Sequence, residues 1–402
     1  MHFKGSKPSK LKVLCLDIEG GHGGSSRSLF NSLKYITESN KIDISVWCKR
    51  GGPIHDKYHR IDIETKIMPF MPTVSTVYRF SRNIILQLKF FLYDWPRSKK
   101  FRKDLIEAAQ DVDLVHGNHE SLFWVLFWLK KNVKTPITLH KRTNPSQSFF
   151  SRLQVLAIDN FASCIVFITE NEKESYFNLG GRMKCGEIIY NIVDSGYENI
   201  KTLKSIPDDS RIKICALANY TYLRATDRLI DVAISLLNKG QKDILFVVAG
   251  DITLTDSLPG ELGRVSKKGG DLSDYADKMG VGDMFVFLGH IAEPERVLLG
   301  CNALIRLNRE NNPWGRDVLE ALSFELPVIT IGVYDIFVEN KVTGFLFDEF
   351  NSQKIADCII ELSNNNELVS NMGESGKRRI KELCNGPDRA QDLIQFWKKV
   401  VC

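Results

Sequence analysis

The chain has 402 residues, of which 43% are hydrophobic, 26% are charged and 10% are aromatic, and its formal net charge is +5 at pH 7. This length exceeds that of one ordinary domain, and the composition is that of a globular protein rather than a disordered one. No apolar run approaches the roughly 20 residues that span a bilayer, and the basic N-terminus lacks a signal-peptide core. We therefore expect a two-domain cytosolic protein.

The charge is divided unevenly along the chain. Residues 1–190 contain 29 Lys and Arg against 18 Asp and Glu, a balance of +11, and the remainder has 25 against 31, a balance of −6. This excess suggests that the first half meets an anionic partner, although solvated lysines on an ordinary surface would give the same count.

The nine cysteines form no CxxC pair and no Cys/His cluster at zinc spacing. Cys15, Cys164 and Cys215 lie in apolar runs, where a thiol behaves as a small hydrophobic group. We expect reduced structural cysteines and no disulfide framework.

Apolar, strand-length runs alternate with amphipathic helical segments, such as 25–36 and 225–240, along the whole chain. The expected strands are residues 12–18, 44–48, 113–118, 137–140, 164–169, 212–217, 244–250, 284–289, 303–307 and 327–331. Near-continuous apolar strands alternating with helices indicate parallel sheets covered on both faces. Two such series predict two doubly wound α/β domains, residues 1–190 and 191–384. A final helix over about 385–402, with Phe396 and Trp397, is expected to pack back on the first domain.

The first predicted strand ends in a glycine-rich loop, DIEGGHGGSSRSLF (17–30), which contains Gly23 and Gly24. Its backbone can approach a phosphate or a sugar closely. The loop has neither the GxGxxG spacing nor the lysine of a P-loop, and a tight strand-to-helix turn is the alternative.

A second junction of this kind lies in NRENNPWGRDVLEALSFELPVIT (308–330). Gly315 precedes a run of strong helix formers, and the first backbone N–H groups of a helix have no intrahelical partner. The start of this helix is therefore a candidate anion site.

In order and spacing, these pieces resemble glycosyltransferase family 4, retaining enzymes of the GT-B architecture, in which two Rossmann-like domains face each other across a cleft. The resemblance covers nearly the whole chain. Its landmarks are GGHGGSSRSL, HGNH (116–119), LHKR (139–142), IIYNIVD (188–194), TDRLIDVA (226–233), VVAGD (247–251), VFLGHI (286–291), the 308–330 stretch and VTGFLF (342–347). It implies transfer of a sugar from a nucleotide-diphosphate sugar to a glycan, lipid-linked or protein acceptor, without a metal or other cofactor.

The resemblance also implies roles for individual residues. The diphosphate or donor sugar would meet Gly23 and Gly24 of the first domain and, in the second domain, the helix start at Trp314, Gly315, Arg316, Asp317 and Val318. Glu320 would hydrogen-bond the ribose hydroxyls, and Ile291, with Glu293 nearby, would contact the base. His140 would lie near the transferred sugar, whereas His116 and His119 are assigned a structural or acceptor-side role.

Three positions depart from the family pattern. Arg224 stands where the family has Lys, but Asn219 is neutral where the family has Arg, which should weaken stabilisation of the leaving group. Asn312 replaces the first Glu of the Glu-x7-Glu motif and could still hydrogen-bond the sugar; Glu310 is an alternative. The expected catalytic set is His140, Arg224 and Asn312.

No carboxylate is marked as a nucleophile or general base, so the enzyme would act by positioning and charge stabilisation. The Asp pair at 111–113 is interpreted as a strand entrance rather than a metal site. The alternatives are a non-catalytic glycan-binding or partner subunit, which Asn219 and Asn312 favour, and a sugar-nucleotide epimerase. A nicotinamide dehydrogenase is disfavoured because its fingerprint is missing. The sequence does not identify the sugar, the base or the acceptor.

Residues 76–104 interleave aromatic and aliphatic side chains with cations. The cations are Arg79, Arg82, Lys89, Arg97, Lys99, Lys100, Arg102 and Lys103. A basic amphipathic helix can lie on an anionic leaflet, although a domain helix with a solvated basic face gives the same pattern. We expect peripheral association with the inner face of the membrane and no nucleic-acid partner.

Overall fold

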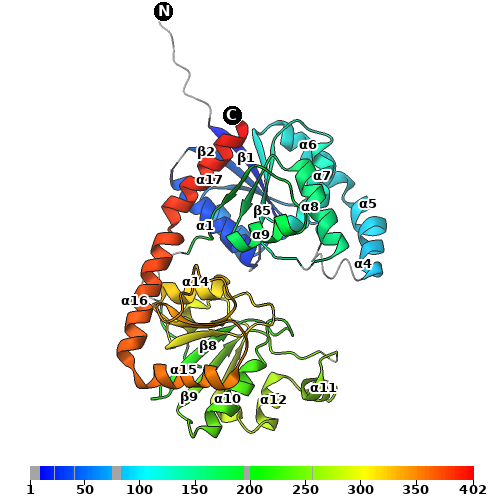
Figure 1. The fold of residues 1–402 in the computed structure, drawn as a ribbon. Coiled ribbons are helices and arrows are strands. Elements are labelled where there is room, and N and C mark those ends of the chain that lie inside the picture. The colour runs from blue at the N-terminus through cyan, green and yellow to red at the C-terminus, as the bar shows by residue number, and fades with distance from the viewer. Residues whose placement is uncertain are drawn as a thin grey trace, which may run out of the picture. The chain divides into compact units, whose positions relative to one another are not determined.

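The computed structural model describes residues 10–21, 23–39, 41–74, 83–145, 147–193, 200–255 and 257–402. The chain forms two compact units, unit 1 (Met1–Ile192 with Cys384–Cys402) and unit 2 (Val193–Leu383). Each is an α/β unit with its own parallel sheet (Figure 1), so the predicted pair of doubly wound domains is confirmed. The sequence places the boundary at 190/191, and the structure changes unit between Ile192 and Val193.

The sheet of unit 1 has seven parallel strands in the order β3-β2-β1-β4-β5-β6-β7. The strands are β1 (Leu11–Asp17), β2 (Ile42–Cys48), β3 (Glu64–Ile67), β4 (Leu114–Gly117), β5 (Ile137–Lys141), β6 (Cys164–Phe167) and β7 (Gly186–Ile188). Because β1 pairs with both β2 and β4, the direction in which strands are added reverses between β1 and β4. In doubly wound folds such a reversal opens a crevice at the carboxyl ends of the strands.

Helices cover both faces of this sheet. They are α1 (Gly24–Glu38), α2 (Pro53–Arg60), α4 (Ile84–Lys89), the π-helical η1 (Phe90–Asp94), α5 (Trp95–Arg97), α6 (Lys99–Gln110), the 3-10 turn η2 (Glu120–Leu122), α7 (Phe123–Lys130), α8 (Phe149–Phe161), α9 (Glu170–Asn178) and α17 (Gly386–Val401). Val13 and Cys15 of β1 pack with α1, α2 and α17, whereas Leu14 and Leu16 pack with α6, α7 and α8. This alternation is the period of a strand that is buried on both faces.

Helix α17 belongs to the core of unit 1. It lies beside α1 (Figure 1), and its Phe396 and Trp397 are fully buried with residues of β1 and α1. The chain therefore returns to unit 1 after unit 2 is complete.

Unit 2 contains six parallel strands in the order β10-β9-β8-β11-β12-β13. They are β8 (Ile212–Leu217), β9 (Ile244–Ala249), β10 (Phe285–Gly289), β11 (Ala303–Arg306), β12 (Val328–Ile331) and β13 (Gly344–Phe347). The reversal lies between β8 and β11, because β8 pairs with both β9 and β11.

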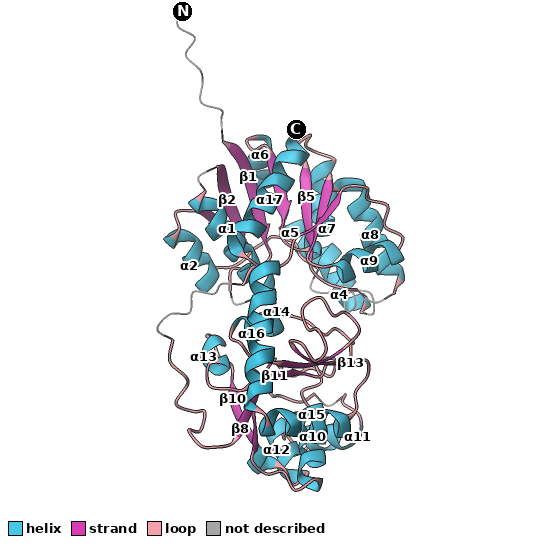
Figure 2. Cartoon of the chain, turned by 60° about the vertical axis from the view of Figure 1, so that its left-hand side comes forward, coloured by secondary structure: helices cyan, strands magenta, loops and turns pink. Residues whose placement is uncertain are grey.

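The helices of unit 2 also form two layers. They are α10 (Arg228–Asn238), α11 (Gly260–Ser266), α12 (Leu272–Lys278), the 3-10 turn η3 (Gly282–Met284), α13 (Glu295–Leu298), α14 (Arg316–Ser323), α15 (Ser352–Asn364) and α16 (Asn366–Leu383). Helices α10, α12 and α15 gather on one side of the sheet (Figure 2) and share its apolar core. Helix α14 contacts β11 and β12, and α16 packs on α14.

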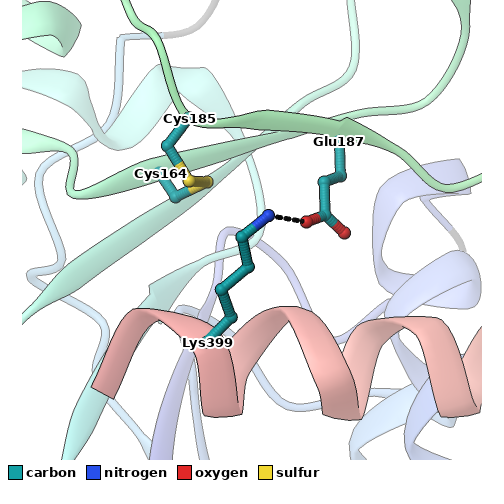
Figure 3. The surroundings of a disulfide bond; sticks show 4 residues. All are labelled: Cys164, Cys185, Glu187 and Lys399. Carbon is teal, nitrogen blue, oxygen red and sulfur yellow. Dashed lines mark hydrogen bonds and ion pairs between the residues drawn. A yellow bond between two sulfur atoms is a disulfide. The ribbon is translucent and has the colours of Figure 1, made fainter. Parts of the chain in front are cut away.

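One cysteine pair departs from expectation. Cys164, at the start of β6, and Cys185, just before β7, form a disulfide, and Lys399 of α17 binds Glu187 of β7 at 2.7 Å nearby (Figure 3). The prediction of reduced cysteines is therefore wrong for this pair, while the other seven cysteines are free and six of those are buried. The pairing depends on the contact between β6 and β7, and the apolar pattern did not predict β7.

Candidate functional site

A pocket lies at the strand-order reversal of unit 2. Its wall combines the carboxyl ends of β8 and β11 with the loop before α10 and the first turn of α14. Its lining residues are Ala216, Leu217, Ala218, Arg224, Ala225, Thr226, Leu229, Ile305, Arg306, Leu307, Asn308 and Asp317. This is the place where doubly wound folds bind ligands.

Helix α14 begins at this pocket. Gly315 is its N-cap residue and makes no side-chain cap, so the first backbone N–H groups of the helix, including those of the predicted Arg316, Asp317 and Val318, are the donors at this end. A Cβ atom on Gly315 would lie 2.4 Å from Asp317 Oδ1 and 3.1 Å from Arg306 Nη1. A side chain at this position would have to displace the ion pair that crosses the helix start.

That ion pair joins Asp317 to Arg306, a residue that the sequence analysis did not select. Arg306 Nη1 donates to both carboxylate oxygens of Asp317, at 2.8 and 3.1 Å, and Arg306 Nε donates to the carbonyl oxygen of Asn312 at 3.2 Å. A charged residue at the end of an otherwise apolar strand run, ALIR, was the signal that could have identified it.

Glu320, predicted to bind ribose, lies one turn into α14 and is only 2% exposed. Its carboxylate accepts hydrogen bonds from Arg316 Nε and Nη2 at 3.2 and 2.9 Å. Arg316 thus neutralises the Glu320 charge, and a ribose would have to share this carboxylate with the guanidinium.

Hydrogen bonds and a ring contact fix the residues that precede α14. Asn312 donates its backbone N–H to Asn308 Oδ1 at 3.1 Å, and its own Oδ1 accepts from the backbone of Trp314 at 3.4 Å. The Trp314 ring packs on Phe337, with centroids 5.3 Å apart, and its buried Nε1 makes no hydrogen bond with the described residues. Glu310, the alternative to Asn312, is exposed to solvent.

The loop between β8 and α10 contains two of the three departures from the family pattern, Asn219 and Arg224. Arg224 is exposed and lines the pocket, as a ligand-binding cation would. Asn219 instead accepts a hydrogen bond through Oδ1 from the backbone N–H of Asp251 at 2.9 Å, which links the loops after β8 and β9. The structure therefore gives Asn219 a loop-joining contact.

Arg309 holds the Arg224 loop in place, and the sequence analysis missed it. Its guanidinium binds Asp227 at 2.9 and 2.5 Å, donates to the Tyr222 carbonyl oxygen at 2.7 Å and lies 4.1 Å from the centroid of the Tyr222 ring. Its backbone N–H also donates to the Leu223 carbonyl oxygen at 2.8 Å. Ala225, which follows Arg224, has a φ of 58°, a backbone conformation that needs such support.

Ile291, the predicted base contact, follows β10 and is half-buried, and Glu293 nearby is exposed and pairs with Arg296 at 3.7 Å. Neither residue lines the pocket.

In unit 1 the glycine-rich loop joins β1 to α1. Gly23 is the N-cap residue of α1 and Gly24 is its first residue. A Cβ atom on Gly23 would lie 2.0 Å from Glu19 Oε2, so the Glu19 carboxylate covers this helix start. An anionic ligand at Gly23 would have to displace it.

His140 lies in β5 and is 4% exposed. Its Nδ1 is 3.1 Å from His116 Nε2, and His116 Nδ1 is 2.8 Å from Thr138 Oγ1 and 3.3 Å from Trp397 Nε1. Burial, reinforced by Arg142, lowers the pKa of His116 to about 3 and lowers that of His140 well below its ordinary value. Both imidazoles are therefore neutral at physiological pH.

A buried ion pair joins Lys141, the residue after His140, to Glu120. Lys141, at the end of β5, is fully buried and lies 3.4 Å from Glu120 Oε1, and the backbone N–H of Arg142 donates to Glu120 Oε2 at 3.0 Å. Burial raises the pKa of Glu120, but Lys141, His119 and hydrogen bonds from the Thr143 hydroxyl and the Arg142 backbone lower it more, to about 2. His119 accepts the Ser121 backbone N–H at 3.0 Å and so caps η2, a structural role.

The Asp111–Asp113 pair also has a structural contact. Asp113 Oδ2 accepts the backbone N–H of Lys12 at 2.8 Å at the entrance to the sheet, as the interpretation of this segment requires.

The basic segment of unit 1 contains one unbroken helical run, α4, η1 and α5 (84–97), which is followed after Ser98 by α6. Arg79 and Arg82 lie outside the described residues. Large apolar side chains project from α4 and η1 into solvent, at 69% exposure for Ile84, 71% for Ile85 and 74% for Leu92. Within the described ranges, no helix is both long and apolar enough to cross a bilayer.

The comparisons with known proteins follow the same division into two units. Residues 200–379 match the family described as "Glycosyl transferases group 1", and residues 22–197 match "Glycosyltransferase Family 4". The search of curated proteins finds no match.

Solved structures give the same fold. Anabaena Alr3699/HepE in complex with UDP-glucose superposes with a TM-score of 0.74 at 18% identity, over 97% of this chain and 100% of that one. Sucrose-phosphate synthase from Thermosynechococcus elongatus gives 0.69 at 14% identity, over 97% and 99%. S. aureus TarM in complex with Fondaparinux, alpha-GlcNAc-glycerol and UDP gives 0.67 at 13%, over 98% and 100%.

At these identities the structural likeness shows the fold alone, whereas the two family matches extend over almost the entire chain. Two parallel-sheet units, each with a strand-order reversal, agree with both. The chain is a glycosyltransferase of the family 4 type with the GT-B architecture.

Proposed function

We propose that this protein transfers a sugar, with retention of anomeric configuration, from a nucleotide-diphosphate sugar to a glycan, lipid-linked or protein acceptor. The observation that supports this most directly is the pocket at the β8–β11 reversal, where Arg224 and the uncapped start of α14 line or border the same space. A cation and a helix N-terminus together favour an anion. Structural neighbours in complex with UDP or UDP-glucose support a nucleotide-sugar donor.

The proposed chemistry assigns few covalent tasks to the protein. The α14 backbone N–H groups and Arg224 would stabilise the negative charge that develops on the departing diphosphate. The acceptor hydroxyl would attack from the face that the diphosphate leaves, so the rate depends on how well the two substrates are held. His140, neutral and buried, would offer the sugar a hydrogen bond and no charge. We propose that no metal is needed for the transfer, and turnover that is lost on chelation and restored by a divalent cation would disprove this.

Arg224→Ala tests the donor site. We expect sugar transfer to fall about tenfold or more, because a charge-assisted contact to the leaving group is lost, while the thermal unfolding temperature is kept. Arg264→Ala is the matched control, since Arg264 lies in the same unit but on an exposed surface, away from the pocket lining. Turnover that is unchanged in Arg224→Ala would remove Arg224 from the site, and NMR of the product anomer tests retention.

A non-catalytic role is the second candidate, and two contacts favour it. Asn219 is neutral and bonds to the Asp251 backbone, and Arg316 already occupies the Glu320 carboxylate. Hydrolysis or transfer assays with UDP-, GDP- and ADP-sugars separate the two candidates. Binding of a glycan without release of any nucleoside diphosphate would support the non-catalytic role.

We also propose that the exposed face of α4 and η1 binds an anionic membrane surface at the inner leaflet. Ile84, Ile85, Leu88, Phe91 and Leu92 form its apolar part, and Lys89, Arg97, Lys99 and Lys100 are exposed along the same series of helices. Each cation near an anionic leaflet contributes about 1 kcal/mol, and apolar side chains at the interface add to this.

Sedimentation with phosphatidylserine-containing vesicles at low and high salt tests this surface. Leu92→Glu should abolish binding, and Val333→Glu is the matched control because Val333 is equally exposed, at 79%, but belongs to unit 2. A wild-type protein that stays in the supernatant at low salt would contradict the proposal.

A further inference from the structure

Arg306 is a second cation at the donor pocket. It ends β11, next to β8, and lines the same pocket as Arg224. Its guanidinium lies directly over the start of α14, because Nη1 is 3.1 Å from the position that a Gly315 Cβ atom would take. The charge that the family pattern places at position 219 is missing, but a guanidinium is present elsewhere on the pocket wall.

Within the described part of the chain, the hydrogen bonds of Arg306, which lines the pocket, use only two of its three guanidinium nitrogens. Nε donates to the Asn312 carbonyl oxygen, and Nη1 alone donates to both oxygens of Asp317. Nη2 makes no hydrogen bond with any residue in the described ranges. The side chain is 15% exposed, so the guanidinium remains within reach of a ligand in the pocket.

We propose that Arg306 binds the diphosphate of the donor and stabilises it as it departs, in the place of the cation that Asn219 lacks. The proposal rests on the proposed transferase function. Asp317 is then the resting counter-ion that keeps Arg306 charged and oriented while the pocket holds no anion. Arginine suits this role because its planar donors can bind a carboxylate and a phosphate oxygen at the same time.

A purely structural role for the pair makes the opposite prediction for one of two variants. Arg306→Gln and Asp317→Asn both break the same ion pair, so a structural role requires both to weaken ligand binding in parallel with stability. If Arg306 binds the diphosphate, the two variants separate. Arg306→Gln removes a ligand contact, whereas Asp317→Asn removes a carboxylate that competes with the diphosphate and keeps the backbone N–H of the helix.

The experiment is calorimetric titration of the full chain with UDP, GDP and ADP, followed by the monophosphate of whichever binds best. We expect Arg306→Gln to weaken diphosphate binding by about tenfold or more and monophosphate binding less, as loss of a charge-assisted hydrogen bond requires. Asp317→Asn should bind the diphosphate as tightly as the wild type or more tightly, and Arg306→Lys should lie between the wild type and Arg306→Gln.

Three results would overturn the assignment. Equal losses in Arg306→Gln and Asp317→Asn would make the pair structural, and undiminished binding by Arg306→Gln would remove Arg306 from the site, both without affecting the proposed function. A wild type that binds none of the three diphosphates would instead overturn the proposed function itself. If Arg306→Gln does not fold, the double variant Arg306→Gln/Asp317→Asn is tested instead, because it leaves no unpaired charge. We expect the double variant to fold and to show the same loss of diphosphate binding. Tight diphosphate binding by the double variant would refute the proposal.

Discussion

Replacing Arg309 by alanine tests how the Arg224 loop is held. The substitution removes the contacts to Asp227, the hydrogen bond to the Tyr222 carbonyl oxygen and the cation over the Tyr222 ring. It leaves the Asp227 carboxylate, whose side chain is 5% exposed, without its guanidinium. Breaking a buried pair costs about 3–5 kcal/mol.

The expected magnitude lies at the lower end of that range. The Arg309 side chain is 20% exposed, so solvent screens part of the interaction. The lost cation–π contact adds about 0.5–1 kcal/mol. We expect the free energy of unfolding to fall by about 3 kcal/mol in total. Because the loop loses its anchor, we also expect kcat/KM for sugar transfer to fall about tenfold or more, as misplacement of a catalytic group does.

Denaturant unfolding and steady-state kinetics on the same variant give the two quantities. Arg379→Ala is the matched control, because Arg379 also binds a carboxylate, that of Glu339, and a backbone carbonyl oxygen, that of Ile336, but not at the pocket. A destabilised Arg309→Ala enzyme with unchanged kcat/KM would show that the contacts of Arg309 do not position Arg224. Unchanged stability would refute the energetic reasoning.

Three further predictions concern unit 1. Burial raises the pKa of Glu172 to about 7, above the ordinary 4.5, so the folded state binds more protons between these values and stability falls as the pH rises through 7. The Glu172→Gln variant should therefore have a higher free energy of unfolding than the wild type at pH 8, by up to about 3 kcal/mol. This difference should vanish near pH 4.5. A difference that does not depend on pH would contradict the reasoning. The disulfide closes a separation of 21 residues, so Cys164→Ser should cost about 3 kcal/mol under oxidising conditions, and dithiothreitol should abolish the difference from the wild type. Lys141→Met should lower the free energy of unfolding by about 3–5 kcal/mol, because it leaves the buried Glu120 carboxylate without its cation. Adding Glu120→Gln should restore most of that loss. No recovery in the double variant would show that the lysine acts through packing alone.

The apolar runs predict the fold well because buried parallel strands are hydrophobic on both faces. All ten predicted strands are present, with ends that differ by a residue or two. The strands that apolar periodicity missed are short or polar: β3 is mostly exposed, and β7 has three residues. The segment of β13 was recognised only as part of the VTGFLF landmark. Such strands are fixed by their neighbours in the sheet rather than by their own composition.

The candidate site was predicted less completely, for a different physical reason. The start of α14 follows from local sequence, because a glycine before a run of helix formers defines a helix end, whereas Arg224 was assigned through the family resemblance. Arg306 and Arg309 follow from neither, because their importance comes from partners that the fold brings to them, Asp317 from α14 and Asp227 from the loop before α10. The same holds for the disulfide, whose cysteines meet only once β6 and β7 are paired.

The position of α17 has a consequence for how this protein is made. Phe396 and Trp397 seal one side of a sheet whose strands all precede Ile192, yet they leave the ribosome only after the whole of unit 2. During translation, the layer of unit 1 that contains Val13, Cys15 and Leu33 therefore has α1 and α2 in place but lacks α17 until synthesis is almost finished. Unit 2 suffers no such delay, so we expect it to reach its final structure first, although it is synthesised second.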